Sequence, residues 1–163
     1  MKPSKDAVNR FPELQPGDIL LYGGGSLVRC LIQFRTWSDV AHVEIYRGGG
    51  RSLASRSDGP RLYPLDIIGL RRVIRPVQTF NFQAGMDWFL SQACHLPYGY
   101  FDLLRFCLVN IPTKGLICSE FTDLFFQKCG LPLFNLNYPE GAVCPRDFEL
   151  ISPLLAKQIW TWK

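Results

Sequence analysis

Residues that bind structural metals are scarce in this sequence. It contains two histidines, His42 and His95, and none of its six cysteines belongs to a Cys-x-x-Cys pair. Structural zinc sites take four cysteine or histidine ligands, which usually occur in closely spaced pairs. We therefore expect no metal, and no other feature of the sequence implies a cofactor.

Long apolar segments are also missing. No stretch approaches the ~18 consecutive apolar residues that cross a bilayer. The first ten residues are polar and charged, unlike the apolar centre of a secretory signal peptide. We therefore expect a cytoplasmic protein with no integral membrane association. In that reducing compartment all six cysteines should be free thiols. They are Cys30, Cys94, Cys107, Cys118, Cys129 and Cys144.

Charge of one sign does not dominate either. The 18 Lys and Arg residues exceed the 14 Asp and Glu residues enough to give a net charge of +4. Because the basic residues are scattered, we expect no nucleic-acid partner. The longest basic cluster is Arg71 and Arg72 with Arg75. We interpret it as a solvated face, the alternative being a phosphate-binding patch.

A large apolar fraction is what the chain does contain. Hydrophobic residues make up 47% of the 163 residues, which is enough for the core of one globular domain. We predict a single domain spanning 1–163, in which 1–14 is a lead-in segment.

The first half of the chain predicts strands. Apolar runs and alternating patterns place them at 19–22, 40–46, 51–56 and 70–75. The glycines at 48–50 are expected to join the second and third strands in a hairpin, and 58–60 is expected to form another turn.

The second half predicts helices, at 84–95, 101–109 and 118–129, with another near 153–160. A short helix is expected at 26–32 and a loop at 111–115. These elements predict an α+β fold, in which a small antiparallel sheet, mostly from residues 17–76, packs against helices from the second half.

Cys118 is the strongest candidate for a chemical role. It lies where a loop is expected to enter the helix at 118–129, close to unpaired N–H groups and the positive end of the helix dipole. Both favour the thiolate and lower the pKa of the thiol, and the same N–H groups can stabilise an oxyanion. A cysteine at a helix start is also commonly a buried apolar residue, so position alone leaves both interpretations open.

A thiolate nucleophile needs an imidazole to accept and return a proton. His42 lies on the polar face of the strand at 40–46, whereas His95 ends a predicted helix, where the helix dipole and capping account for it. We therefore predict His42 as the base. A polar histidine in a strand is also commonly structural, so this pair alone does not establish an enzyme.

Three segments resemble the motifs of permuted NlpC-type papain-like amidases and cysteine peptidases. They are 16–20 (Pro-Gly-Asp-Ile-Leu), 42–46 (His-Val-Glu-Ile-Tyr) and 118–121 (Cys-Ser-Glu-Phe). Segment 96–100 with Asp102, and segment 144–148, resemble two further segments of that family, so the likeness extends from Gln15 to about Pro153. It implies a circularly permuted papain-like fold, with Cys118 as nucleophile and His42 as base. His precedes Cys, the reverse of ordinary papain-like enzymes.

One position departs from the family pattern. There, a polar residue, often Glu, orients the histidine from the strand that returns after the hairpin, and the matching position here is Ala54. Glu44 lies two residues after His42 on the same strand face, so it is our candidate third catalytic residue. As a strand-surface carboxylate it is expected to contribute little to stability. The alternatives are the hydroxyls of Ser52, Ser55 and Ser57.

The function implied by this resemblance is hydrolysis of an amide bond, such as one in cell-wall-type peptides, or of an ester bond, through a thioester on Cys118. The expected partner is a peptide or an acyl or lipid substrate. One alternative is a lipid acyltransferase or phospholipase on the same scaffold, which exposed Trp160 and Trp162 would favour. Another is a non-catalytic binding module, which the missing acid at Ala54 slightly favours.

Overall fold

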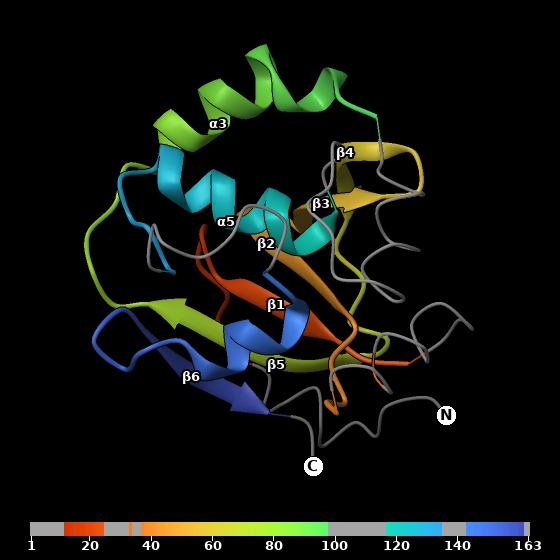
Figure 1. Ribbon diagram of the computed structural model, residues 1–163, viewed down its shortest axis with the longest axis vertical. Helices are drawn as coiled ribbons and strands as arrows, with labels where there is room; N and C mark the ends of the chain where they lie inside the picture. Colours follow the sequence, from red (N-terminus) through yellow and green to blue (C-terminus); the bar gives the residue numbers. More distant parts are fainter. Residues whose placement is uncertain (1–11, 25–32, 34–36, 98–116, 135–142, 162–163) are drawn as a thin grey trace.

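The computed structural model describes residues 12–24, 33, 37–97, 117–134 and 143–161, and these form an α+β structure around an antiparallel sheet (Figure 1). Within the described residues the sheet has six strands in the order β4-β3-β2-β1-β5-β6. The strands are β1 (Ile19–Tyr22), β2 (His42–Gly48), β3 (Arg51–Arg56), β4 (Gly59–Pro64), β5 (Leu70–Pro76) and β6 (Ala156–Thr161). The predicted α+β class, with an antiparallel sheet packed against helices, is confirmed.

The predicted hairpin joins β2 and β3. Gly48, Gly49 and Gly50 have φ angles of 101°, 60° and 68°, a region that glycine adopts without steric cost. The turn expected at 58–60 is placed differently, because residues 57–58 alone form the turn and Gly59 already belongs to β4. The sequence did not predict β4, whose prolines at 60 and 64 look like strand breakers. An edge strand tolerates them, since one of its sides needs no ladder hydrogen bonds.

The helix predicted near 153–160 is wrong. Residues 156–161 form β6, which pairs antiparallel with β5. Ile159, Trp160 and Thr161 are residue types that favour strands, and pairing with β5 satisfies the backbone groups along one side of β6. The sheet is therefore not confined to residues 17–76.

Two α-helices are described in the second half. Helix α3 (Phe82–Ser91) begins two residues earlier than predicted, because the Asn81 side chain accepts a hydrogen bond of 3.1 Å from the Ala84 N–H. It is followed by a short 3-10 helix, η1 (Ala93–His95). Leu90 of α3 is 58% exposed. The predicted elements at 26–32, 101–109 and 111–115 lie outside the described residues.

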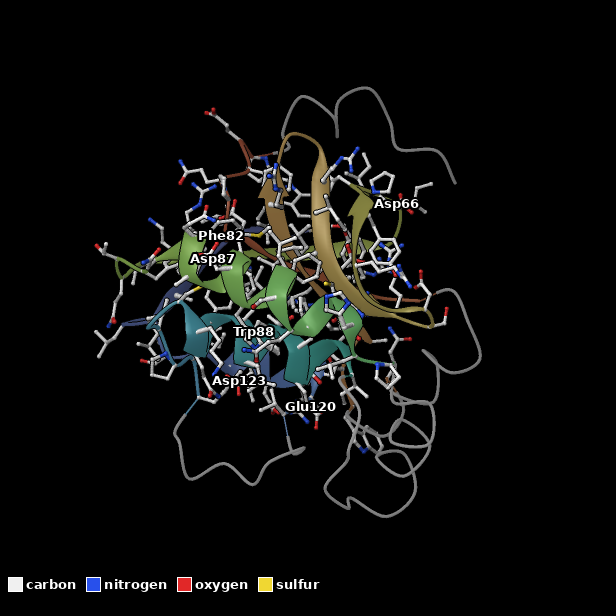
Figure 2. The ribbon with its side chains drawn as sticks, turned by 90° about the horizontal axis from the view of Figure 1, so that it is seen from above. Asp66, Phe82, Asp87, Trp88, Glu120 and Asp123 are labelled. Carbon is white, nitrogen blue, oxygen red and sulfur yellow. The ribbon has the colours of Figure 1, made fainter. Side chains whose placement is uncertain are left out.

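Helix α5 (Cys118–Lys128) agrees with the prediction to within one residue. It packs against β2 and β3, and α3 packs against α5 (Figure 1). Figure 2 shows the two helices side by side, with Trp88 on α3 and Asp123 on α5. The ring of Trp88 stacks on Phe121 at 6.0 Å between centroids. A β-carbon on Gly85 of α3 would lie 2.5 Å from the Cys129 sulfur, so glycine is needed for this close approach.

The two faces of the sheet carry separate apolar clusters. The larger one contains Val43 and Ile45 of β2 together with the phenylalanines of α5. The second cluster contains Leu20, Tyr22, Leu70 and Val73, and half-buried Trp160 packs against it. Trp160 therefore serves the packing of the sheet, and Trp162 lies outside the described residues.

Two arginines of the basic cluster, Arg72 and Arg75, form ion pairs. Arg75 contacts both oxygens of the buried Asp18 carboxylate at 2.7 Å. Arg72 lies 2.7 Å from Asp39 and 2.7 Å from Glu149. The side chains of these two arginines are partly exposed, and their charges tie β5 to neighbouring segments.

Candidate active site

Cys118 is the first residue of α5, and its neighbours fix the start of that helix. The Glu120 carboxylate accepts a hydrogen bond of 3.3 Å from the Ile117 N–H. The buried Ser119 hydroxyl donates to the Val143 carbonyl at 2.6 Å, which ties the helix start to the segment that precedes the 3-10 helix η2 (Pro145–Leu150). The sulfur of Cys118 is thereby held at a helix N-terminus, as the sequence predicted.

His42 begins β2 at the end of the sheet nearest the start of α5. The backbone before it is held by β1, because the Ala41 N–H donates to the Tyr22 carbonyl at 2.7 Å. The rings of Tyr22 and His42 are tilted against each other at 6.2 Å between centroids. The Cys118 thiol and the His42 imidazole are both buried and lie close enough for each to shift the pKa of the other. The structure therefore brings together the two residues that the sequence paired.

His95 lies elsewhere. It is exposed at the end of η1, which packs against β4. Its place near a helix end agrees with the capping role that the sequence suggested for it.

Glu44 completes a chain of contacts behind His42. Its carboxylate is 1% exposed, and its Oε1 lies 3.0 Å from His42 Nε2. An ionised carboxylate only accepts hydrogen bonds, so His42 Nε2 carries a proton and donates it to Glu44.

Of the three serines proposed as alternatives to Glu44, Ser52 contacts the Glu44 carboxylate. Ser52 donates its hydroxyl hydrogen to Glu44 Oε2 at 2.6 Å, so it acts on the carboxylate. Ser55 is buried in β3 and Ser57 is exposed in the turn after it. Ala54 is buried between Ser52 and Arg56 on the same face of β3.

Sequence reasoning missed Arg56. Its Nε and Nη2 atoms donate to Glu44 Oε1 at 3.0 Å and 2.5 Å. The available signal was alternation: residues 52, 54 and 56 face the same side of β3, next to the strand that carries Glu44.

The electrostatics of the pair favour its charged form. Burial would lower the pKa of His42, but the charge and hydrogen bond of Cys118, followed by those of Glu44, raise this pKa to about 9. Burial would likewise raise the pKa of Cys118. The charge and hydrogen bond of His42, with backbone N–H groups of Val43 and Ser119, outweigh burial and hold the pKa of the thiol below its ordinary value.

Two other described thiols behave in the opposite way. Burial raises the pKa of Cys129 to about 12, and burial together with Asp147 raises that of Cys144 to about 11. Cys94, Cys118, Cys129 and Cys144 are free thiols, while Cys30 and Cys107 lie outside the described residues. Near neutral pH the thiolate is therefore concentrated on Cys118 relative to Cys129 and Cys144.

Glu44 is held ionised. Burial would raise its pKa, but the hydrogen bond and charge of His42, the Ser52 hydrogen bond and the charge of Arg56 lower it to about 2. Across the described residues, no group of three or more His, Cys, Asp or Glu side chains is arranged to hold a metal ion. The same part of the chain contains no helix long and apolar enough to cross a membrane.

The other segments that carry the family resemblance lie away from the Cys118–His42–Glu44 group or outside the described residues. Asp18 of the segment 16–20 is buried against Arg75 and serves the sheet. Residues 98–102 lie outside the described residues. In segment 144–148, the Asp147 carboxylate accepts a hydrogen bond of 2.7 Å from the Cys144 N–H and opens η2. Comparison of the sequence with models of known families and with curated proteins finds no match.

Proposed function

We propose that this protein is a cysteine hydrolase of papain-like chemistry that cleaves an amide bond, or an ester bond, through a thioester on Cys118. The observation that carries the proposal is a buried group of three side chains, in which Glu44 lies 3.0 Å from His42 and the side chains of Cys118 and His42 shift each other's pKa. The pKa of each member is shifted in the direction that favours the charged form used in nucleophilic catalysis.

The first half of the reaction forms the thioester. The Cys118 thiolate attacks the substrate carbonyl carbon, and the carbonyl oxygen takes up the negative charge. N–H groups at the start of α5, including that of Cys118 itself, are suited to stabilise this oxyanion. The carbon–nitrogen or carbon–oxygen bond then breaks, and the His42 imidazolium gives its proton to the leaving amine or alcohol. The acyl group remains bonded to the Cys118 sulfur.

The second half releases the acid. Neutral His42 removes a proton from a water molecule, the resulting hydroxide attacks the thioester carbon, and the carbon–sulfur bond breaks. Cys118 leaves as a thiolate and His42 is again an imidazolium, which restores the starting pair. Glu44 keeps the ring in one orientation throughout, because it binds the Nε2 proton.

Two structural observations favour this function over the alternatives. The contact between Glu44 and His42 supplies an orienting acid, which removes the main reason to favour a non-catalytic module. Trp160 packs against the second apolar cluster, so it does not supply the exposed surface that would favour a lipid acyltransferase or phospholipase.

The test is the alkylation rate of Cys118 by iodoacetamide between pH 5 and pH 9, followed by peptide mapping. Wild-type protein should label Cys118 before Cys129 and Cys144 near neutral pH. His42→Ala should slow this labelling, since each unit by which the thiol pKa rises leaves about a tenth of the thiolate. At high pH, where any thiol ionises, the difference should shrink.

The matched control is His95→Ala, which removes an imidazole from an exposed position in η1. Its labelling profile should coincide with that of the wild type. Superimposable profiles for wild type and His42→Ala would reject the proposed function in favour of a binding module.

A further inference from the structure

The Glu44 carboxylate receives more hydrogen bonds than orienting His42 requires. Oε1 accepts from His42 Nε2 at 3.0 Å and from Arg56 Nε and Nη2 at 3.0 Å and 2.5 Å, while Oε2 accepts from Ser52 at 2.6 Å. The carboxylate is 1% exposed, so these donors replace its hydration. With donors on both oxygens, it cannot rotate without breaking several charge-assisted bonds.

Arg56 is itself held from the opposite side. Its guanidinium carbon lies 4.1 Å from the centre of the Tyr63 ring on β4, in cation–π geometry. The Tyr63 hydroxyl donates to the Asp58 carboxylate in the β3–β4 turn. The Arg56 side chain is 32% exposed. The β3–β4 hairpin therefore holds the Arg56 guanidinium between the Tyr63 ring and the buried Glu44 carboxylate.

In the proposed reaction the charge of His42 changes, so Glu44 needs a second positive charge that does not change. His42 is charged before the attack and neutral after it protonates the leaving group. Without a second cation, Glu44 would then be a buried charge with no counter-charge, which proteins avoid by protonating the group. Arg56 stays charged at every step, because guanidinium does not deprotonate in proteins.

We propose that Arg56 is a positioning residue of this active site, which keeps the Glu44 carboxylate ionised and directed at His42 through both halves of the reaction. The inference rests on the proposed function for its purpose, but its physical content, the state of Glu44, is independent of turnover.

Four other side chains face His42, Glu44 or Arg56. Cys118 faces His42 from α5, Tyr22 faces it from β1, Ser52 reaches Glu44 from β3, and Tyr63 lies behind Arg56 on β4. None of these four supplies a permanent positive charge, so substitution of Arg56 should change the state of Glu44 directly.

The experiment compares Arg56→Gln, Arg56→Lys and the control Arg61→Gln. Arg61 lies on the same hairpin, is 59% exposed and pairs with Asp58 at 3.2 Å, so its loss removes a nearby positive charge without touching Glu44. The first measurement is the carboxyl ¹³C titration of Glu44 by NMR, assigned with Glu44→Gln. The second is the labelling rate of Cys118 at pH 7.

In Arg56→Gln, Glu44 should take up a proton about 1–3 pH units above its wild-type titration, the usual effect of removing an adjacent opposite charge. Labelling of Cys118 should slow severalfold. Arg56→Lys should keep the low titration, because it keeps the charge, and should label at an intermediate rate, because it loses the two-nitrogen fork. Arg61→Gln should match the wild type in both measurements.

An unchanged Glu44 titration in Arg56→Gln would overturn the inference, as would an equal shift in Arg61→Gln. If Arg56→Gln does not fold, a wild-type labelling rate in Arg56→Lys would overturn it, and a slowed rate with an unshifted titration would support it. Absence of His42-dependent labelling in the wild type would reject the proposed function, while the Glu44 titration would still decide the role of Arg56.

Discussion

At the scale of single residues, Glu44 joins stability to chemistry. Its carboxylate orients the base of the proposed reaction, and it also neutralises Arg56 inside the protein. The sequence suggested a strand-surface carboxylate of little value to folding. The expected surface position is wrong, because the side chain is buried.

We predict that Glu44→Gln lowers both reactivity and stability. The amide carries no charge and offers one acceptor oxygen, so His42 and Arg56 lose their counter-charge. Breaking a partly buried ion pair should cost roughly 2–4 kcal/mol of unfolding free energy. Denaturant unfolding at pH 7 and the Cys118 labelling rate measure the two effects.

Glu13→Gln is the matched control, because Glu13 is exposed. A change of less than about 0.5 kcal/mol is expected there. Equal stability of Glu44→Gln and wild type would contradict the burial of the Glu44 ion pairs.

At the residue scale, the sequence could predict the pair but not its support. His42 and Cys118 stand in motifs that can be recognised from adjacent residues. Arg56 cannot be recognised in this way, because its contact with Glu44 depends on how β2 and β3 pair, and on Ala54 being small enough to let its neighbours on β3 reach across.

At the scale of elements, the sequence predicted those helices and strands that depend on residues close together in the chain. The β2–β3 hairpin follows from alternation and three glycines, and the end of α5 follows from Gly130, whose φ is 79°. Strand β6 was missed because its partner, β5, is distant in the sequence. The residues at 153–160 do not by themselves show that β5 has an edge to which they can pair.

The close packing of α3 on α5 gives a prediction about Gly85. In an exposed helix, Gly→Ala stabilises by about 1 kcal/mol. Here the added methyl group would meet the Cys129 sulfur at 2.5 Å and the Phe125 ring at 2.7 Å, so the helices must separate. We expect Gly85→Ala to destabilise by roughly 1–3 kcal/mol, the usual cost of overpacking.

Thermal or denaturant unfolding checks this value. Gln83→Ala, at an exposed position of the same helix, should stay near the wild type. A stabilised Gly85→Ala would show that α3 and α5 have room to spare.

At the scale of the whole molecule, the buried charges make stability depend on acidity. The pKa of Glu44 falls from 4.5 to about 2 on folding. Because its folded pKa is the lower one, the stabilising contribution is fully present above pH 4.5 and is lost as pH falls towards 2.

We therefore predict that the difference in unfolding free energy between wild type and Glu44→Gln depends on pH. It should be greatest above pH 4.5 and should shrink to near zero around pH 2. Urea unfolding of both proteins at several pH values measures it. A difference that stays constant across this range would mean that Glu44 does not titrate with a depressed pKa.

The position of β6 has a consequence for how the chain behaves while it is being made. Strand β5 lies between β1 and β6, so its outer edge stays uncovered until residues 156–161 leave the ribosome. An uncovered edge invites pairing between copies of a chain. The exposed Lys157 on β6 and the prolines of β4 protect the two edges of the finished sheet. A chain that stops at Leu155 should therefore self-associate with rising concentration in sedimentation velocity, whereas the full chain should not do so through this edge.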